Sequence, residues 1–172
     1  ANPILPSPSA DPWVMQHDGW YYYCESRHQD AIYIRKARNF IHLNQDPGVM
    51  VWSAPAFGAN SKSLWAPELH FIQGKWYIYY AADDGLNENH RMWVLEASDP
   101  VGPYVCRGAL ETDTWAIDGT ILEGPGGSLY CVWSGWPGRV NGQQNLYIAP
   151  MHNPWTLSGP RVLLAQVAAA PA

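Results

Sequence analysis

The chain of 172 residues has little charge and no cationic patch of useful size. Charged residues make up 15% of the sequence, and 10 Lys and Arg against 15 Asp and Glu give a net charge of −5. The one tight basic group is Arg35, Lys36 and Arg38, which we interpret as a solvated strand end. Because phosphate binding requires clustered Lys and Arg, we predict no nucleic-acid partner.

Long apolar runs and processing signals are also missing. No run approaches the roughly 18 apolar residues that a membrane-spanning helix requires, so we predict no membrane partner. No basic-then-apolar leader is present. The chain starts at Ala1 instead of Met, which favours a processed or trimmed N-terminus. The cellular location stays open, with a lean towards a secreted or extracytoplasmic protein.

Cysteine and metal-binding patterns are sparse. Cys24, Cys106 and Cys131 lie in strand-like runs, and their odd number favours buried thiols over a disulfide framework. The six His residues lack the spacing of metal ligands, so no metal is predicted for this chain. Glycine-rich phosphate loops and the Gly-x-Ser-x-Gly elbow are absent too.

Helical periodicity is nearly absent, whereas strand signals are frequent. Gly and Pro, 15 of each, interrupt the chain throughout. Short runs of Val, Ile, Tyr and Trp between Gly, Pro, Asn and Asp are typical of strands. We therefore predict an all-β fold. The ten Trp and ten Tyr residues suit a core, but they also suit a sugar site, where such rings stack on the substrate.

The sequence contains three repeats, each opened by an acidic residue. Asp11, Glu68 and Asp118 each lead a short apolar run, a Gly-containing turn and an aromatic-rich run. The steps from 11 to 68 and from 68 to 118 are 57 and 50 residues. A third and a fourth strand can be matched in every repeat. The expected second, third and fourth strands are 20–24, 31–34 and 49–52, then 75–80, 91–94 and 104–107, then 129–133, 145–148 and 161–164.

Four strands at a period near fifty are typical of β-propeller blades. We expect a partial propeller over residues 1–165, with blades at about 11–53, 68–110 and 118–165, followed by a tail at 166–172. The first strand of a blade lies innermost, so the three acids would converge at one end of the channel. Turn formation is the alternative explanation for Asp11 before Pro12 and for Asp118 before Gly119.

Three motifs in order resemble glycoside hydrolase family 43. They are the opening Asn2–Pro6 with Ala10–Val14, then Leu64–Glu68, then Ala116–Gly119. The resemblance covers about residues 2–165, and the stretch from Trp133 to Val162 is most similar to arabinofuranosidase-type members. It implies a five-bladed propeller, of which three blades are present here. It also implies hydrolysis of arabinofuranosyl or xylosyl linkages in plant polysaccharides.

By this resemblance Asp11 would be the general base of an inverting hydrolase. Asp118 would tune the pKa of the general acid and orient it, and Glu68 would support the channel mouth or a neighbouring side chain. The acid itself, a Glu opening a fourth blade in the family, has no counterpart here. Glu123 in Glu123–Pro125 looks similar, but a tight turn explains it better. Family members often hold calcium through a late-blade His that this chain lacks, so calcium is expected only in a complete propeller.

Further residues could contact a sugar. Trp65 and Trp115 precede the second and third acids and would serve as stacking walls or as packing between blades. Trp136 would make a rim contact, Arg27 would donate to sugar hydroxyls, and Trp13 would pack in the core. The missing blades would come from a longer chain, a second chain or a second copy. We predict removal of α-L-arabinofuranosyl units from arabinan or arabinoxylan; a β-xylosidase and a non-catalytic carbohydrate-binding propeller fragment are the alternatives.

Overall fold

The computed structural model describes residues 3–5 and 9–166 and consists of three antiparallel sheets. The first sheet contains β1 (Trp13–His17), β2 (Trp20–Arg27), β3 (Ala31–Ala37) and β4 (Val49–Ser53). The second contains β5 (Lys62–Ile72), β6 (Lys75–Asp83), β7 (Arg91–Ala97) and β8 (Val105–Ala109). The third contains β9 (Ala116–Glu123), β10 (Leu129–Gly135) and β11 (Asn145–Asn153), with β12 (Thr156–Leu157) and β13 (Val162–Ala165) both pairing with β11.

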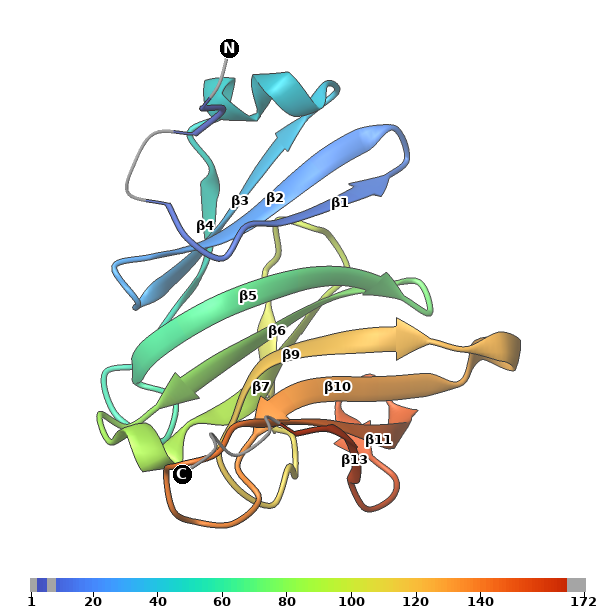
Figure 1. Ribbon diagram of the computed structural model, residues 1–172. Coiled ribbons are helices and arrows are strands. Elements are labelled where there is room, and N and C mark those ends of the chain that lie inside the picture. Colours follow the sequence, from blue (N-terminus) through green and yellow to red (C-terminus); the bar gives the residue numbers. More distant parts are fainter. Residues whose placement is uncertain (1–2, 6–8, 167–172) are drawn as a thin grey trace.

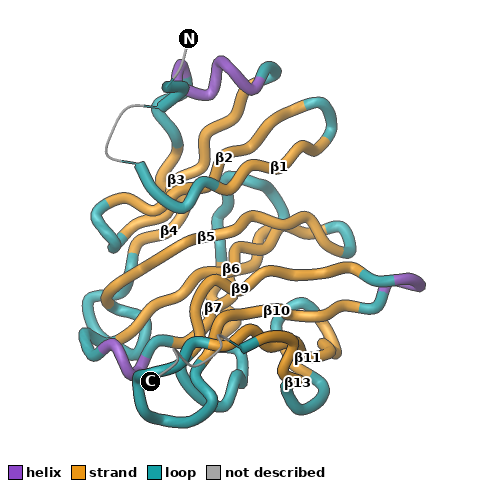
Figure 2. The backbone as a smooth tube through the Cα atoms, in the orientation of Figure 1, coloured by secondary structure: helices purple, strands orange, loops and turns teal. Residues whose placement is uncertain are grey.

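The sheets lie one beside the next like the blades of an open fan (Figure 1), and almost all regular structure is strand (Figure 2). The predicted all-β class and the three repeated sheets are therefore confirmed, but within the described residues the sheets do not close into a ring. In the described part of the chain, three short 3₁₀ helices connect strands: η1 (Phe40–Gln45), η2 (Asn87–Asn89) and η3 (Pro125–Gly127). None of the described helices is long and apolar enough to span a membrane.

Tight turns fix the first hairpin of the first two blades. Asp18 and Gly19 join β1 to β2 with φ of 47° and 73°, and Gln73 and Gly74 join β5 to β6 with φ of 50° and 81°. Two consecutive left-handed residues form the type I′ turn, whose twist matches that of the flanking strands. The register places His17 opposite Trp20 and Ile72 opposite Lys75. The short polar turns of the sequence thus set the pairing of the strands that carry the site.

Apolar cores lie between neighbouring blades. Ile32, Ile78 and Tyr80 belong to the cluster that the first and second blades share, and Trp13 packs against it as predicted. Met92, Trp133 and Tyr147 belong to the cluster between the second and third blades. Since fully burying one large apolar side chain stabilises a fold by about 1.5–3 kcal/mol, these two interfaces hold the blades in fixed relative positions.

Several strands are longer than predicted. β5 begins at Lys62 instead of Glu68, so Trp65 lies inside the strand. β3, β7 and β11 continue through Ala37, Ala97 and Asn153, where we expected the strands to have ended. Backbone pairing with the second strand of each sheet continues there, opposite Tyr21 for Ala37, Trp76 for Ala97 and Leu129 for Met151. The predicted tail, apart from Gln166, lies outside the described residues.

The cysteine prediction holds for two of the three residues. All three are free thiols, and Cys24 and Cys131 are buried, whereas Cys106 is partly exposed. Burial raises the pKa of the Cys131 thiol to about 12, which keeps it in the unreactive thiol form. Cys106 is more exposed than the other two thiols because it lies on β8, the outer edge strand of its sheet.

Candidate active site

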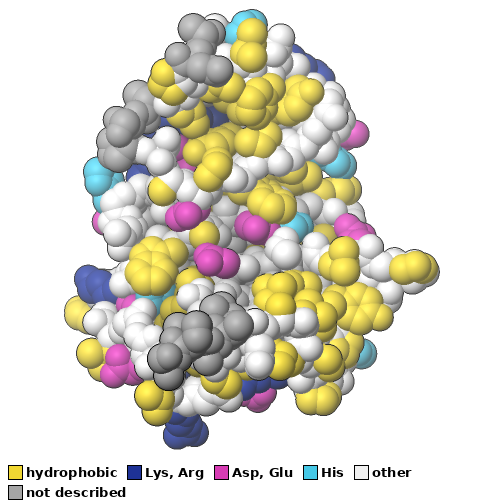
Figure 3. Space-filling view, viewed as in Figure 1, with side chains coloured by type: hydrophobic (Ala, Val, Ile, Leu, Met, Phe, Trp, Pro, Cys, Tyr) yellow, Lys and Arg dark blue, Asp and Glu magenta, His cyan; other side chains and the backbone are white. Residues whose placement is uncertain are grey.

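Asp11, Glu68 and Asp118 line one cavity, together with Pro12, Trp13, Ala66 and Pro67. Its volume is about 200 Å³, and we call it the smaller cavity. Figure 3 shows acidic side chains gathered in the middle of this face, between β1, β5 and β9. The three acids, 107 residues apart from first to last, are therefore brought together by the repeated first strands.

Irregular backbone aims the acids at the cavity. Asp11 and Asp118 have φ of 48° and 51°, and Ala66, two residues before Glu68, has φ of 41°. The pairing of β9 with β10 shifts register between Ile117 and Thr120, and that of β5 with β6 shifts around Trp65 and Glu68. Such bulges turn a side chain out of the regular alternation. A non-glycine residue held there costs about 1–3 kcal/mol, and such strain concentrates at functional sites.

Electrostatic repulsion links the three carboxylates. Loss of water raises the pKa of the Asp118 carboxyl above its ordinary value, and the charges of Asp11 and Glu68 raise it further. A carboxylate near two others resists ionisation, because each like charge disfavours the charged form. The smaller cavity is therefore a site of concentrated negative charge, suited to a base and to holding a neighbouring acid in its protonated form.

Glu68 is fixed by a histidine. Its Oε2 lies 3.0 Å from His70 Nε2, two residues further along β5 on the same face. The His70 ring packs against Trp13, with centroids 4.9 Å apart, and edge-on against Tyr79. The indole Nε1–H of Trp13 donates to the Leu69 carbonyl at 2.7 Å. The first and second blades are thus bonded to each other directly beneath the acids.

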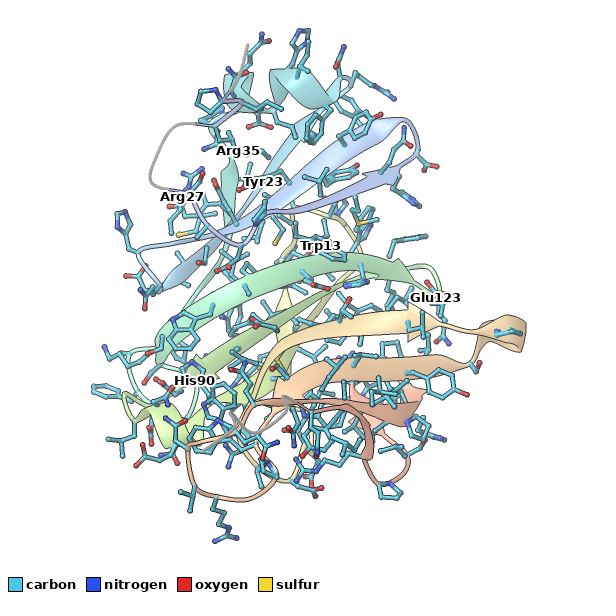
Figure 4. The ribbon with its side chains drawn as sticks, in the orientation of Figure 1. Trp13, Tyr23, Arg27, Arg35, His90 and Glu123 are labelled. Carbon is cyan, nitrogen blue, oxygen red and sulfur yellow. The ribbon has the colours of Figure 1, made fainter. Side chains whose placement is uncertain are left out.

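A larger cavity of about 880 Å³ shares Asp11 with the smaller one and includes Glu25, Arg27, Gln29, Arg35 and Trp65 in its wall. Glu25 Oε1 accepts hydrogen bonds from Arg27 Nε at 2.9 Å and from Arg35 Nε at 3.0 Å. Arg27 also donates to the Pro47 carbonyl at 2.7 Å. Figure 4 shows both arginines beside Tyr23 on the first sheet. Arg35 is therefore a paired cavity residue and not part of a solvated strand end.

The three tryptophans proposed for the site occupy different environments. Trp65 is partly exposed and lines the larger cavity. Trp115 and Trp136 are only 6% and 4% exposed, and their rings stack on each other with centroids 4.8 Å apart. Trp136 lies on the loop after β10, as expected, but the Trp115 ring covers it. Packing, the alternative considered for Trp115, accounts for this pair.

Glu123 lies far from the acids. It ends β9, five residues after Asp118, which corresponds to about 17 Å along a strand. Figure 4 shows its label at the end of the sheet away from the start of β9. The turn at Pro125–Gly127 follows directly. This position agrees with the structural explanation for Glu123.

Sequence patterns missed the histidines near the site. His70 was predictable only from its place two residues after Glu68, and His90 gave no signal because its partners lie on other strands. The described residues include no group of three or more His, Cys, Asp or Glu side chains arranged to hold a metal ion. Calcium in a complete propeller stays an expectation from the family resemblance.

The first strands of three neighbouring blades bring carboxylates to one cavity, which defines a partial β-propeller with an acidic site. The family model of "Glycosyl hydrolases family 43" matches residues 1–170. The chain belongs to this family.

Relatives agree with this assignment. The chain is 37% identical to "Alpha-L-arabinofuranosidase 43" of Humicola insolens, over 91% of this chain and 34% of that protein. It is 35% identical to "Extracellular exo-alpha-(1->5)-L-arabinofuranosidase" of Streptomyces chartreusis, over 95% of this chain and 52% of that protein. The crystal structure of an alpha-L-arabinofuranosidase from Lactobacillus brevis superposes with a TM-score of 0.86 at 36% identity, over 95% of this chain and 55% of that one. The chain thus spans between a third and about half of these relatives.

Proposed function

We propose that this chain supplies the general-base half of an inverting glycosidase that removes α-L-arabinofuranosyl units from arabinan or arabinoxylan. The observation that carries the proposal is the meeting of Asp11, Glu68 and Asp118 in one cavity of about 200 Å³. The names of the relatives from Humicola insolens and Streptomyces chartreusis support arabinofuranose as the sugar. The word "extracellular" in the second name supports a secreted protein.

Asp11 activates the attacking water in this proposal. It lines both cavities, so its carboxylate can reach a water in the smaller cavity and a sugar in the larger one. In an inverting reaction the base and the acid stand roughly 6.5–9.5 Å apart on opposite faces of the sugar, which leaves room for that water. The base of such a reaction acts as a carboxylate, which accepts a proton from the attacking water.

Asp118 and Glu68 prepare the site for a protonated acid. A general acid must keep its proton near neutral pH, and neighbouring negative charge raises the pKa of a carboxyl. Asp118 provides that charge and orients the acid. Glu68, paired with His70 at 3.0 Å, fixes the wall of the cavity. Arg27 presents its guanidinium to the larger cavity, where it donates to sugar hydroxyls.

The proton donor comes from outside this chain. Glu123 ends β9 away from the acids, and the chain spans 52% or less of the relatives from Humicola insolens and Streptomyces chartreusis. We assign the donor to further blades, on the same polypeptide or on a second chain, that complete a five-bladed propeller. This division explains how a chain can retain a base and a modulator without an acid.

Hydrolysis of a dinitrophenyl α-L-arabinofuranoside tests the proposal. A very good leaving group needs little protonation, so turnover is expected even without the acid. Asp11→Asn should lower kcat by about 10²–10⁴-fold, because it removes the general base. Asn tolerates the left-handed backbone at this position, so the fold is kept. Asp18→Asn is the matched control, since Asp18 is also left-handed, with φ of 47°, and its side chain is 88% exposed.

The outcomes separate the alternatives. Undiminished turnover by Asp11→Asn would contradict the base assignment. Faster hydrolysis of the matching β-xyloside would make the protein a β-xylosidase. Binding of arabino-oligosaccharides without turnover, unchanged by Asp11→Asn, would instead support a non-catalytic carbohydrate-binding propeller.

A further inference from the structure

The side chain of His90 is completely buried between three elements that meet at the site. His90 follows η2 and precedes β7, and it is 0% exposed. Its Nε2 lies 3.1 Å from the Ser63 carbonyl oxygen on β5, and its Nδ1 lies 2.9 Å from Asp83 Oδ2 at the end of β6. Asp83 is itself only 2% exposed and accepts a hydrogen bond from the Gly85 amide at 2.9 Å. Figure 4 shows His90 near the start of β5.

The surroundings of His90 fix where its protons lie. A carbonyl oxygen only accepts hydrogen bonds, so Nε2 carries a proton. Nδ1 then faces a carboxylate oxygen at 2.9 Å, in an arrangement too bent for a regular hydrogen bond. A buried pair of this kind is costly to desolvate, and it needs a compensating role or contact.

The ring above His90 belongs to Trp65. The two rings stack with centroids 4.0 Å apart and planes 28° apart. Trp65 Nε1 donates to Gln29 Oε1 at 3.1 Å, across the boundary between the first and second blades. The Gln29 carbonyl accepts from the Leu64 amide at 2.9 Å, which ties the same turn to β5. Trp65 is thus held at its edge by Gln29 and on one face by His90.

The same histidine contacts the strand that carries Asp118. The Ala116 amide donates to the His90 carbonyl at 3.2 Å, two residues before Asp118. The His90 ring also lies edge-on to Trp115, at a centroid distance of 6.4 Å. His90 therefore contacts both the Trp65 ring, on the wall of the larger cavity, and the start of β9, beside the smaller cavity.

We propose that His90 is a positioning residue, which with Asp83 and Gln29 fixes the Trp65 ring as the platform on which the arabinofuranosyl ring stacks. Tryptophan presents a large aromatic face, and holding that face in place before the ligand arrives lowers the ordering cost of binding. The sugar part of this statement rests on the proposed function, whereas the positioning of Trp65 by His90 does not.

A fluorine NMR experiment separates the two parts. The chain is labelled with 5-fluorotryptophan, and the Trp65 line is assigned by its loss in Trp65→Phe. In the free protein we expect one narrow Trp65 line, which shifts and broadens in His90→Gln and in Asp83→Asn. The line of Trp20, which lies on the first blade away from His90, should keep its position. An unchanged Trp65 line in folded His90→Gln would overturn the positioning role.

Gln29→Asn provides a variant with little risk to the fold. It shortens the side chain in a turn where Gln29 has φ of 57°, a conformation that Asn also adopts. We expect the Trp65 line to shift here too, because the bond to the indole is lost. If His90→Gln does not fold, this variant and Asp83→Asn carry the test. Unchanged Trp65 lines in both would contradict the proposal.

Titration with α-1,5-linked arabinotriose then tests the platform. We expect binding to shift the Trp65 line and to weaken about tenfold in His90→Gln. In a Trp65→Phe background, His90→Gln should cause no further loss, because the histidine acts through the tryptophan. Equal losses in both backgrounds would contradict action through Trp65. The parent protein could fail to bind arabinotriose while the variants still shift the Trp65 line in the absence of ligand. That result would count against the proposed function and not against the positioning of Trp65 by His90.

Discussion

Glu96 illustrates how one buried carboxylate holds the outer part of a blade. It is 6% exposed, and its two oxygens accept from Arg107 Nη2 at 2.9 Å and Nε at 3.0 Å. Lys75 contacts it from β6. Arg107, and then Lys75, lower the pKa of Glu96 to about 2, against the opposing effect of burial. The group therefore joins three neighbouring strands through its charged form.

Glu96→Gln should destabilise the fold at pH 7, by an amount that shrinks on acidification. The folded-state pKa is depressed, so the stabilisation is present above the unfolded pKa near 4.5 and is lost as the pH falls through about 2. Urea unfolding of both proteins between pH 7 and pH 3 measures the difference. Glu88→Gln, at an exposed position, is the control. A difference that stays constant across this range would contradict the ion-pair explanation.

Among the elements, the hairpin between β5 and β6 depends on one glycine. Gly74 has φ of 81°, and a Cβ added there would meet nothing within 4 Å. Gly74→Ala should therefore cost about 1–2 kcal/mol of unfolding free energy purely through the left-handed backbone. Thermal or urea unfolding measures it.

Gly138→Ala is the matched control for this hairpin, because Gly138 also has open space and does not have a left-handed φ. We expect no comparable loss in that variant. Equal losses at both glycines would show that the turn geometry is not what Gly74 provides.

The same hairpins explain how far the sequence could predict the fold. Short turns such as Asp18–Gly19 fix pairing locally, so the first two strands of each blade were predictable. The start of β5 at Lys62 was not, because Ser63 and Ala66 adopt left-handed conformations that no local signal indicates. Strand ends such as Ala97 depend on pairing with a neighbouring strand rather than on their own side chains.

The candidate site was also predictable in part. Asp11, Glu68 and Asp118 repeat at a recognisable period, so their meeting in one cavity followed from equivalent positions in repeats. The sequence did not predict a role for His90, because its partners become neighbours only when β5, β6 and β7 pair. Those partners are Ser63, Asp83 and Trp65. Trp115 and Trp136 were predicted from their places before Asp118 and after the second strand, and sequence position does not reveal that their rings stack on each other.

Over the whole molecule, the third sheet leaves an apolar face uncovered by another described blade. Residues of β10 and β11 alternate between the core and this face. Leu146 is 41% exposed and Val162, which pairs with Ile148, is 57% exposed on the same side. Apolar faces of this kind mark contact with another surface. In the proposed function that surface is a further blade.

Without such a blade, this face should associate with other copies at high concentration. We expect sedimentation equilibrium to give an average mass above 19.2 kDa that rises with concentration. The double variant Leu146→Lys, Val162→Lys should remain near 19.2 kDa. Leu86→Lys, which changes an exposed leucine before η2, is the control. A parent protein that stays monomeric would contradict association through this face.

Convergence of the three carboxylates is the central claim, and titration of Asp118 tests it most directly. The Asp118 carboxyl is followed by ¹³C NMR in the parent protein, in Asp11→Asn and in Asp18→Asn. In the parent its pKa should lie above the ordinary aspartate value, raised by loss of water and by the charges of Asp11 and Glu68. Asp11→Asn removes one of those charges, so the Asp118 pKa should fall, while Asp18→Asn should leave it unchanged. An Asp118 pKa at the ordinary aspartate value would contradict the convergence of the three carboxylates. So would an Asp118 pKa that is the same in the parent protein and in Asp11→Asn.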